Sequence, residues 1–376
     1  MENIQPRGRL PDRLEYLDSL RGIAAILVVL HHIYQTAPFW SGFVRFSPFR
    51  LLLNGRSSVI FFFVLSGFVL AYGLLRGDQP TRFVKFALRR VARIYVPYLV
   101  AGLIAIGAMI VLSPSMLPDT AVTFNEMWQS PIDWKTALGH LGLIGTNEAN
   151  SINTPSWSLV YELRISLLIP ALCFFASRSF CLFLGLSSSA YLLNEIVMAR
   201  LALSPVPYGA TGVAENFLFT VHFAAYFVVG LLLAKAATVR ADWLYNMQGR
   251  QKTVLILIGG PLLFVFRDAA GAIGAAIVII LAINSSAFQT FLRKPILLWL
   301  GRISFSLYLT HTIVLQIVVR LLHGYVPLSL SLVATLILIF PIAALFFQFV
   351  EMPAIQLSRW IGRRDIPADA VGDQRG

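Results

Sequence analysis

Acidic and other charged residues are scarce in this chain. Only 18 of its 376 residues are aspartate or glutamate, and charged residues of both signs together make up 13%. A soluble globular domain carries about 25% charged residues, so this shortage excludes a soluble fold. Hydrophobic residues account for 57% and the mean hydropathy is +0.74, which predicts an integral membrane protein.

Cysteine is also scarce, because the chain holds only Cys173 and Cys181. Two cysteines in adjacent apolar runs argue against a disulfide framework, a zinc site or a redox motif, and we expect no bound metal. The 30 lysines and arginines give a net charge of +12, yet they gather between apolar runs. That distribution follows the positive-inside rule of membrane proteins, so we expect no nucleic-acid partner.

Long apolar runs dominate what the sequence does contain. A membrane-spanning helix needs about 20 mainly apolar residues, and runs of this kind predict an all-α integral membrane bundle of about ten transmembrane helices. The predicted spans cover residues 17–36, 57–76, 94–113, 156–177, 180–202, 216–236, 252–267, 271–289, 303–323 and 329–350. The spans 252–267 and 271–289 are divided only by the segment RDAAGAIG.

The basic residues predict the topology. If the N-terminus lies in the cytoplasm and the spans alternate, most of the lysines and arginines fall on the cytoplasmic side, as the positive-inside rule requires. We therefore expect both termini in the cytoplasm. The predicted domains are an N-terminal cytoplasmic segment 1–16, a transmembrane domain 17–350, and a cytoplasmic tail 351–376 that is largely disordered after residue 360.

The first predicted span carries ionisable residues, which are costly in lipid and indicate function. Arg21 and His32 are eleven residues apart, so they share one helix face and lie roughly 16 Å apart along the axis. His31 points about 100° away, and Asp18 can pair with Arg21 at a spacing of three residues. The alternative is a snorkelling Arg21 and a His32 that only packs.

The predicted span 156–177 carries a carboxylate in its first two turns. Glu162 lies about seven residues into it, at a predicted depth similar to that of His32. A carboxylate that orients or charges an imidazole produces a general base. The alternative is a structural ion pair of Glu162 with Arg164 or with another helix.

A basic segment, RFVKFALRRVARIYVPYLV, precedes the third span. Arg90 and Arg93 lie three residues apart in it, and guanidinium groups bind phosphates through paired hydrogen bonds. This predicts a phosphate-binding surface at the cytoplasmic side, with plain positive-inside anchoring as the alternative.

The ninth span carries a polar stripe in LGRISFSLYLTHTIVLQIVV. His311 lies in mid-span, with Tyr308 one turn before it, and both are expected to face the bundle interior. A substrate contact and a hydrogen-bonded packing histidine are equally compatible with this stripe. We interpret His140, His222 and His323 as structural or interfacial.

Six segments, taken in order, resemble the acyltransferase 3 family of integral membrane acyltransferases. They are LDSLRGIAAILVVLHH, FFFVLSGFVL, RRVARIYVPY, SWSLVYE, LGRISFSLYLTH and FVEMPAIQL. The likeness extends over residues 14–360. The arginine and histidine of the first segment are a weak signal alone, whereas the ordered set is specific.

The resemblance implies a multi-pass enzyme of the bacterial inner membrane. Such an enzyme moves an acyl group, commonly acetyl from acetyl-CoA, to a hydroxyl of a cell-surface or lipid-linked glycan. Acyl-CoA, a glycan acceptor and the bilayer are the expected partners, and acetyl-CoA is the expected co-substrate.

The resemblance also assigns residue roles. His32 would be the catalytic histidine that takes the proton from the acceptor hydroxyl, with Arg21 as its partner in the motif. Arg90 and Arg93 match the pattern associated with CoA binding. Glu162 is expected to orient His32 or stabilise its cation, and both direct transfer and an acyl-histidine intermediate are open.

Two other classes stay open. A secondary transporter would use buried histidine, glutamate and arginine as a proton relay, although it predicts repeat symmetry that the sequence does not show. A non-catalytic membrane scaffold leaves the alignment of Arg21 with His32 unexplained.

Overall fold

The computed structural model describes residues 14–37, 47, 49, 53–77, 83–128, 134–143, 151–203, 212–239, 241–263, 265 and 267–363. These residues form helices and no strand. The predicted N-terminal segment lies outside the described residues up to residue 13, and the tail lies outside them from residue 364.

The helices follow one another along the chain without a second domain of different architecture in the described ranges. They are α1 (Glu15–Thr36), α3 (Gly55–Arg76), α4 (Phe83–Leu112), α5 (Val122–Glu126), α6 (Trp134–Leu141), α8 (Ser156–Arg178), α9 (Phe180–Arg200), α10 (Val213–Thr238), α11 (Asp242–Tyr245), α12 (Gly249–Leu262), α13 (Asp268–Asn284), α14 (Ser286–Leu292), α15 (Pro295–Leu322), α16 (Leu328–Phe346), the π-helix η4 (Phe347–Glu351) and α17 (Met352–Arg363).

Helix lengths confirm the all-α membrane bundle. Within the described ranges, eight helices are long and apolar enough to cross a membrane, and a ninth span results if α13 and α14 are joined across their 100° bend. The predicted span 252–267 corresponds to α12, whose 14 residues fall short of the roughly 20 that a span needs. The total of ten spans and the cytoplasmic placement of both ends stay predictions.

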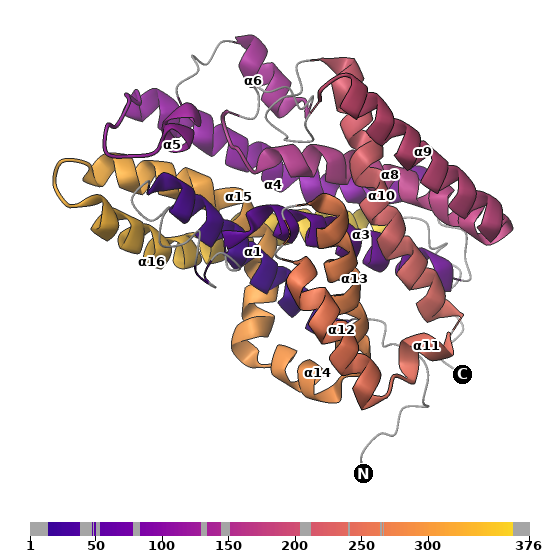
Figure 1. Ribbon diagram of the computed structural model, residues 1–376. Helices are drawn as coiled ribbons and strands as arrows, with labels where there is room; N and C mark the ends of the chain where they lie inside the picture. The colour runs from indigo at the N-terminus through magenta and orange to yellow at the C-terminus, as the bar shows by residue number, and fades with distance from the viewer. Residues whose placement is uncertain are drawn as a thin grey trace, which may run out of the picture.

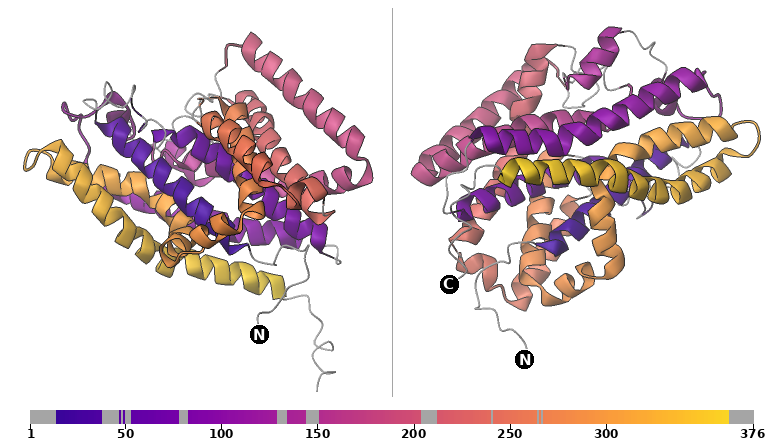
Figure 2. Two further views of the ribbon diagram at one scale, coloured as in Figure 1. Left: turned by 60° about the horizontal axis from the view of Figure 1, so that its bottom comes forward. Right: turned by 180° about the vertical axis from the view of Figure 1, so that it is seen from behind.

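Several predicted boundaries differ from the structure, and α15, for example, begins at Pro295, eight residues before the predicted span 303–323. Helix α4 begins at Phe83, eleven residues before the predicted span 94–113, because the basic segment continues the same helix. Residues 352–363, predicted as the start of a tail, form α17, which lies along α4 (Figure 2). Ser358 Oγ donates a hydrogen bond to Arg89 O at 3.0 Å across this contact.

Helix α3 is the most central element of the bundle, in contact with α1, α8, α10 and α13 (Figure 1). Helix α9 lies at the outer edge (Figure 2), with only 11% of its apolar window buried. Apolar side chains on such an outer helix face lipid, where their exposure costs nothing.

Small residues allow the central helices to approach closely. A Cβ atom on Gly22 would lie 2.7 Å from the backbone nitrogen of Gly301, which joins α1 to α15. A Cβ atom on Gly67 would overlap the backbone carbonyl of Phe227, which joins α3 to α10. Both contacts are backbone to backbone, so neither can relax through a flexible side chain.

Gly67→Ala is therefore expected to destabilise the bundle. Overpacking of this kind costs about 1–3 kcal/mol, and the thermal unfolding temperature of the purified protein measures the loss. Gly73→Ala on the same helix is the matched control, because nothing lies within 4 Å of a Cβ atom at Gly73. Equal unfolding temperatures for the two variants would contradict the close contact of α3 with α10.

Two contacts fix the relative direction of α1 and α15. Gly22 packs on the backbone of Gly301 near one end, and the His32 ring packs against the His311 ring near the other. The two helices therefore run in the same direction. We call the end at which α1 begins the arginine end, after Arg21, and the opposite end the histidine end, after His32.

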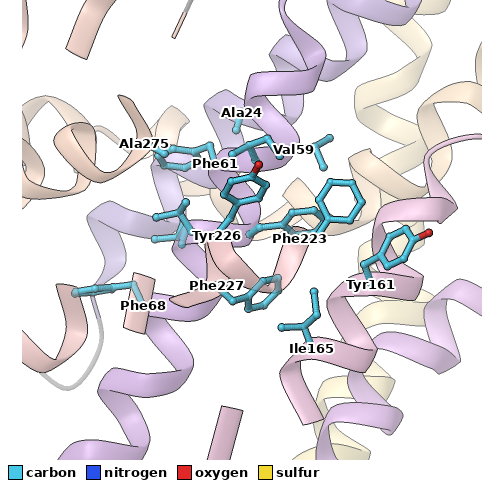
Figure 3. Close-up of a cluster of buried hydrophobic side chains, with 14 of the residues drawn as sticks. Ala24, Val59, Phe61, Phe68, Tyr161, Ile165, Phe223, Tyr226, Phe227 and Ala275 are labelled. Carbon is cyan, nitrogen blue, oxygen red and sulfur yellow. The ribbon is translucent and has the colours of Figure 1, made fainter. Parts of the chain in front are cut away.

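Aromatic side chains fill the interior between α3, α8 and α10 (Figure 3). The Phe223 ring lies at their centre, with its centroid 4.9 Å from that of Tyr161, 5.2 Å from that of Phe63 and 5.5 Å from that of Trp157. Such tilted contacts are worth about 0.5–1.5 kcal/mol each beyond area burial. They hold α8 rigidly against α3, next to the cavity described below.

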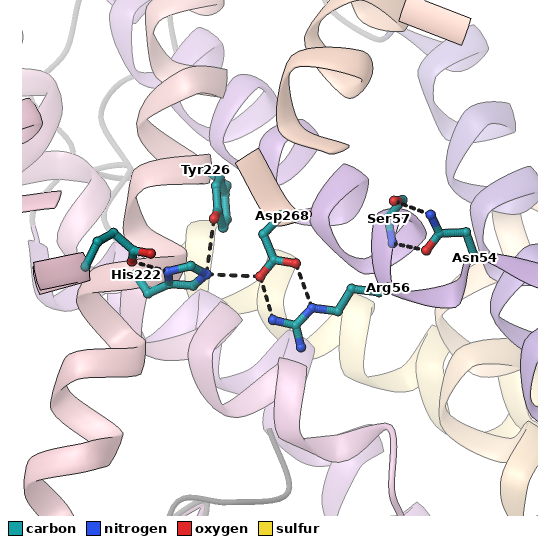
Figure 4. Close-up of polar contacts among 7 residues, drawn as sticks. Asn54, Arg56, Ser57, His222, Tyr226 and Asp268 are labelled. Atoms are coloured by element: carbon teal, nitrogen blue, oxygen red, sulfur yellow. Dashed lines mark hydrogen bonds and ion pairs between the residues drawn. The ribbon is translucent and has the colours of Figure 1, made fainter. Parts of the chain in front are cut away.

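A network of charged side chains joins α3, α9, α10 and α13 (Figure 4). Arg56 donates to both carboxylate oxygens of Asp268, at 2.8 and 2.5 Å. His222 places one ring nitrogen 3.0 Å from Asp268 and the other 2.6 Å from Glu195, with the Tyr226 hydroxyl 3.1 Å away. The interpretation of His222 as structural is consistent with these contacts.

Candidate active site

A cavity of about 370 Å³ lies at the arginine end of the bundle. Helices α1, α3, α4, α8 and α15 line it, together with η4 and α17. Its charged lining consists of five arginines and three carboxylates, namely Arg21, Arg90, Arg93, Arg302, Arg359, Asp18, Glu162 and Glu351. Five of the predicted site residues thus line one cavity, although they are far apart in sequence, namely Arg21, Arg90, Arg93, Glu162 and Tyr308.

Two of these arginines are paired with carboxylates. Arg21 lies 3.7 Å from Asp18, which confirms the predicted pair in the first turn of α1. Arg90 lies 3.4 Å from Glu162 and also donates from Nε to Ser166 Oγ at 3.2 Å. These contacts hold both guanidinium groups in place at the wall of the cavity.

The other three arginines supply spare positive charge. Arg93, Arg302 and Arg359 are solvent-exposed at the cavity, and no carboxylate of the described chain lies within ion-pair distance of them. The third cavity carboxylate, Glu351, accepts a hydrogen bond from Ser306 at 2.6 Å. The cavity therefore has an excess of guanidinium groups, which suits an anionic ligand such as a phosphate.

Tyr308 closes the inner end of the cavity. Its hydroxyl lies 2.7 Å from Ser158 Oγ and donates to Pro155 O at 3.1 Å, so it ties α15 to the start of α8. The Tyr308 ring packs against Phe62, with centroids 5.7 Å apart, on the cavity side. On the other side its centroid lies 5.8 Å from that of His311.

Beyond Tyr308 lie two buried histidines. The rings of His32 and His311 have centroids 5.1 Å apart, and their residues are 6% and 1% exposed. Neither ring lines the cavity. His31, by contrast, is half-buried, its Nδ1 donates to Leu53 O at 2.6 Å, and it packs on Gly55.

The structure does not bring Glu162 and His32 together. Glu162 lies one helical turn on the arginine side of Ser158, whereas His32 packs with His311, nearly a turn beyond Tyr308. Because Ser158 bonds Tyr308, the two groups are about 10 Å apart along the bundle. The Glu162 carboxylate instead forms an ion pair with Arg90 of α4. This agrees with the alternative interpretation, a structural ion pair with another helix.

The comparisons with known proteins agree with this architecture. The chain matches the family model described as the acyltransferase domain over residues 14–348. It belongs to the acyltransferase 3 family. This acyltransferase is therefore a multi-pass membrane enzyme of that family, as the resemblance implied.

Two relatives of this acyltransferase cover nearly the whole chain. The Acyltransferase MdmB of Streptomyces mycarofaciens is 28% identical over 381 residues, which covers 94% of this chain and 93% of that protein. The O-acetyltransferase PaAT-1 of Phomopsis amygdali is 23% identical over 421 residues, covering 93% and 84%. No solved structure matches the chain.

The structure adds two arginines to the site of this acyltransferase. Arg302 and Arg359 belong to the basic residues that the topology argument places on the cytoplasmic side, and both line the cavity. The sequence did hint at both residues. Arg302 lies within the family-like segment LGRISFSLYLTH, and Arg359 lies shortly after the family-like segment FVEMPAIQL. Among the described residues, no group of three or more His, Cys, Asp or Glu side chains is arranged to hold a metal ion.

Proposed function

We propose that this acyltransferase moves an acetyl group from acetyl-CoA to a hydroxyl group of a cell-surface or lipid-linked glycan. The donor enters at the arginine end, which faces the cytoplasm of a bacterial cell, and the acceptor reaches the histidine end from the outer side of the inner membrane. The observation that carries the proposal is the excess of guanidinium groups in the cavity, next to a buried histidine pair.

The dimensions of the site support a donor with a long arm. Arg21 and His32 lie on the same helix, roughly 16 Å apart along its axis. The phosphates of acetyl-CoA are separated from its thioester by a long flexible chain, so phosphates held by the arginines allow the thioester to extend toward His32. Tyr308 lies between the two regions and would contact that chain once its side chain rotates.

The chemistry is general-base acyl transfer. His32 takes the proton of the acceptor hydroxyl, whose oxygen attacks the thioester carbon, and the carbon–sulfur bond then breaks. General-base assistance of this kind contributes about 10²–10⁴-fold to the rate. The printed name of the O-acetyltransferase relative supports an oxygen acceptor and an acetyl group.

The test is acetyl transfer by the purified protein in lipid nanodiscs. Radiolabelled acetyl-CoA is added with and without surface glycan extracted from the bacterial source, and label that appears in the glycan supports the proposal. Proton movement across proteoliposomes without any label transfer would favour the secondary transporter, although membership of the acyltransferase family favours the enzyme.

Arg93→Gln is expected to weaken donor binding more than it slows the chemistry. Arg93 has no ion pair to lose within the described chain, so its removal costs a phosphate contact rather than a structural one. A charge-assisted hydrogen bond is worth about 1.5–3 kcal/mol, which corresponds to roughly a tenfold or greater rise in the KM for acetyl-CoA.

Arg89→Gln is the matched control, because Arg89 is exposed on α4 but does not line the cavity. Its donor KM is expected to stay within twofold of the wild-type value. If Arg93→Gln gave an unchanged donor KM and only less protein in the membrane, the anchoring alternative would be correct.

A further inference from the structure

The His311 ring is held in one orientation by its own helix. Its Nδ1 lies 2.8 Å from Tyr308 O and 3.2 Å from Leu307 O. Carbonyl oxygens only accept hydrogen bonds, so Nδ1 carries the proton in the neutral ring. The other nitrogen, Nε2, is then a lone-pair acceptor, and it is enclosed without a hydrogen-bond partner among the described residues.

The neighbouring ring leaves a second enclosed nitrogen without a partner. His32 Nδ1 is buried and makes no hydrogen bond within the described chain, and its ring centroid lies 5.1 Å from that of His311. Buried polar atoms without partners are rare in native proteins and call for an explanation such as a catalytic role or an unseen water. Two of them in adjacent rings indicate that one contact accounts for both.

The chemistry of the two rings fixes the direction of that contact. Because His311 Nε2 can only accept, His32 must be the donor, from Nδ1. A direct hydrogen bond needs a rotation of the His32 ring, and a bridging water serves equally. In both cases His32 carries its proton on Nδ1, which leaves Nε2 as the nitrogen that takes a proton.

We propose that His311 is the positioning residue that orients His32 as the general base, an inference that rests on the proposed function. His311 Nε2 accepts the hydrogen bond of His32 Nδ1–H and so fixes both the tautomer and the ring angle. The acceptor hydroxyl gives its proton to His32 Nε2 as its oxygen attacks the thioester carbon. When the carbon–sulfur bond breaks, His32 returns that proton to the sulfur.

The other side chains that could orient His32 have different neighbours in the structure. Glu162 contacts Arg90 and Ser66 at the cavity, on the far side of Tyr308. His31 follows a different face of α1, about 100° from His32, and packs against the start of α3 at Gly55. His311 thus takes the place that the sequence had predicted for Glu162.

The experiment measures kcat and donor KM for His311→Leu and His311→Gln in acetyl transfer from radiolabelled acetyl-CoA to extracted surface glycan. His311→Leu removes the acceptor nitrogen, and we expect kcat to fall about 10–100-fold, as when the partner that orients a metal-bound histidine is lost. The donor KM should stay within twofold. His311→Gln keeps an acceptor oxygen and should recover at least tenfold of the loss.

A double variant separates positioning from a structural role. If His311 acts only through His32, adding His311→Leu to His32→Ala should lower the residual rate no further, because groups that act as a unit are not additive. Thr310→Val is the control on the same helix, since Thr310 is similarly buried but bonds only the backbone at Ser306 O, at 2.9 Å. It should keep kcat within twofold of wild type.

Each outcome decides one proposal. A wild-type rate in His311→Leu, a His311→Gln variant no better than His311→Leu, or additive losses in the double variant would overturn the role of His311, even if His32→Ala kept its large loss of rate. Absence of acetyl transfer by the wild-type protein would overturn the proposed function itself. If His311→Leu did not fold, the kcat of His311→Gln against that of Thr310→Val would decide.

Discussion

His32→Ala is expected to remove nearly all acyl transfer and leave a small residual rate, while the protein still inserts and folds. The imidazole is buried beside His311 and makes no hydrogen bond through Nδ1 within the described chain, so its truncation removes the proposed base and a ring contact but breaks no hydrogen bond of that nitrogen in the described structure. The cost is at least the 10²–10⁴-fold that general-base assistance supplies. Steady-state transfer from acetyl-CoA, with size-exclusion profiles of the same preparation, measures activity and folding together.

His31→Gln is the matched control for this substitution. His31 is adjacent in sequence, but its Nδ1 donates to Leu53 O at 2.6 Å, a bond that the glutamine amide can replace. We expect at least a third of the wild-type rate. Equal loss of activity in two folded variants would show that His32 is not the base, and the choice between the two histidines would be open again.

The sequence predicted those features of the fold that depend only on the order of residues along a single helix. Apolar length alone identifies a membrane helix, so the first, second, fourth and sixth spans match α1, α3, α8 and α10 within a few residues. Helical spacing also predicted the pair of Arg21 with Asp18, three residues earlier on α1. None of these conclusions depends on how the helices cross.

Predictions that depend on relative depth were less accurate. Counting residues from Pro155 placed Glu162 at the depth of His32, but α8 is fixed to α15 through Ser158 and Tyr308. That bond sets Glu162 about one turn from Tyr308 toward the arginine end, and so nearly two turns from the depth of His32. A single sequence does not encode the stagger between two helices, so the partner of a buried carboxylate could not be read from it.

The same reason explains what the sequence missed at the cavity. Arg302 and Arg359 look like ordinary positive-inside charges, since nothing local distinguishes an anchoring arginine from one that lines a cavity. Helix α17 brings Arg359 there by folding along α4. Likewise, Arg56 and Asp268 are 212 residues apart, and only the packing of α3 against α13 reveals that they are partners.

Asp268→Ala is expected to destabilise the protein severely. Asp268 is only 9% exposed in its side chain, and it is the carboxylate that Arg56 and His222 share. Removing one partner of a buried ion pair costs about 3–5 kcal/mol, because the remaining charge stays buried without compensation. The free energy of unfolding of the purified protein, from titration with a denaturing detergent, should fall by that amount.

Two further variants serve as controls for Asp268→Ala. Asp268→Asn keeps the size and an acceptor oxygen but loses the charge, so its free energy of unfolding should lie between those of Asp268→Ala and wild type. Asp119→Ala removes a carboxylate that is 77% exposed and 3.8 Å from His323, and exposed substitutions stay within about 0.5 kcal/mol. If Asp268→Ala were as stable as Asp119→Ala, the network of α3, α9, α10 and α13 would not stabilise the bundle.

The expected order, with Asp268→Ala lowest, follows because Asp268 is the one group that joins the guanidinium of Arg56 to the imidazole of His222 in the described structure (Figure 4).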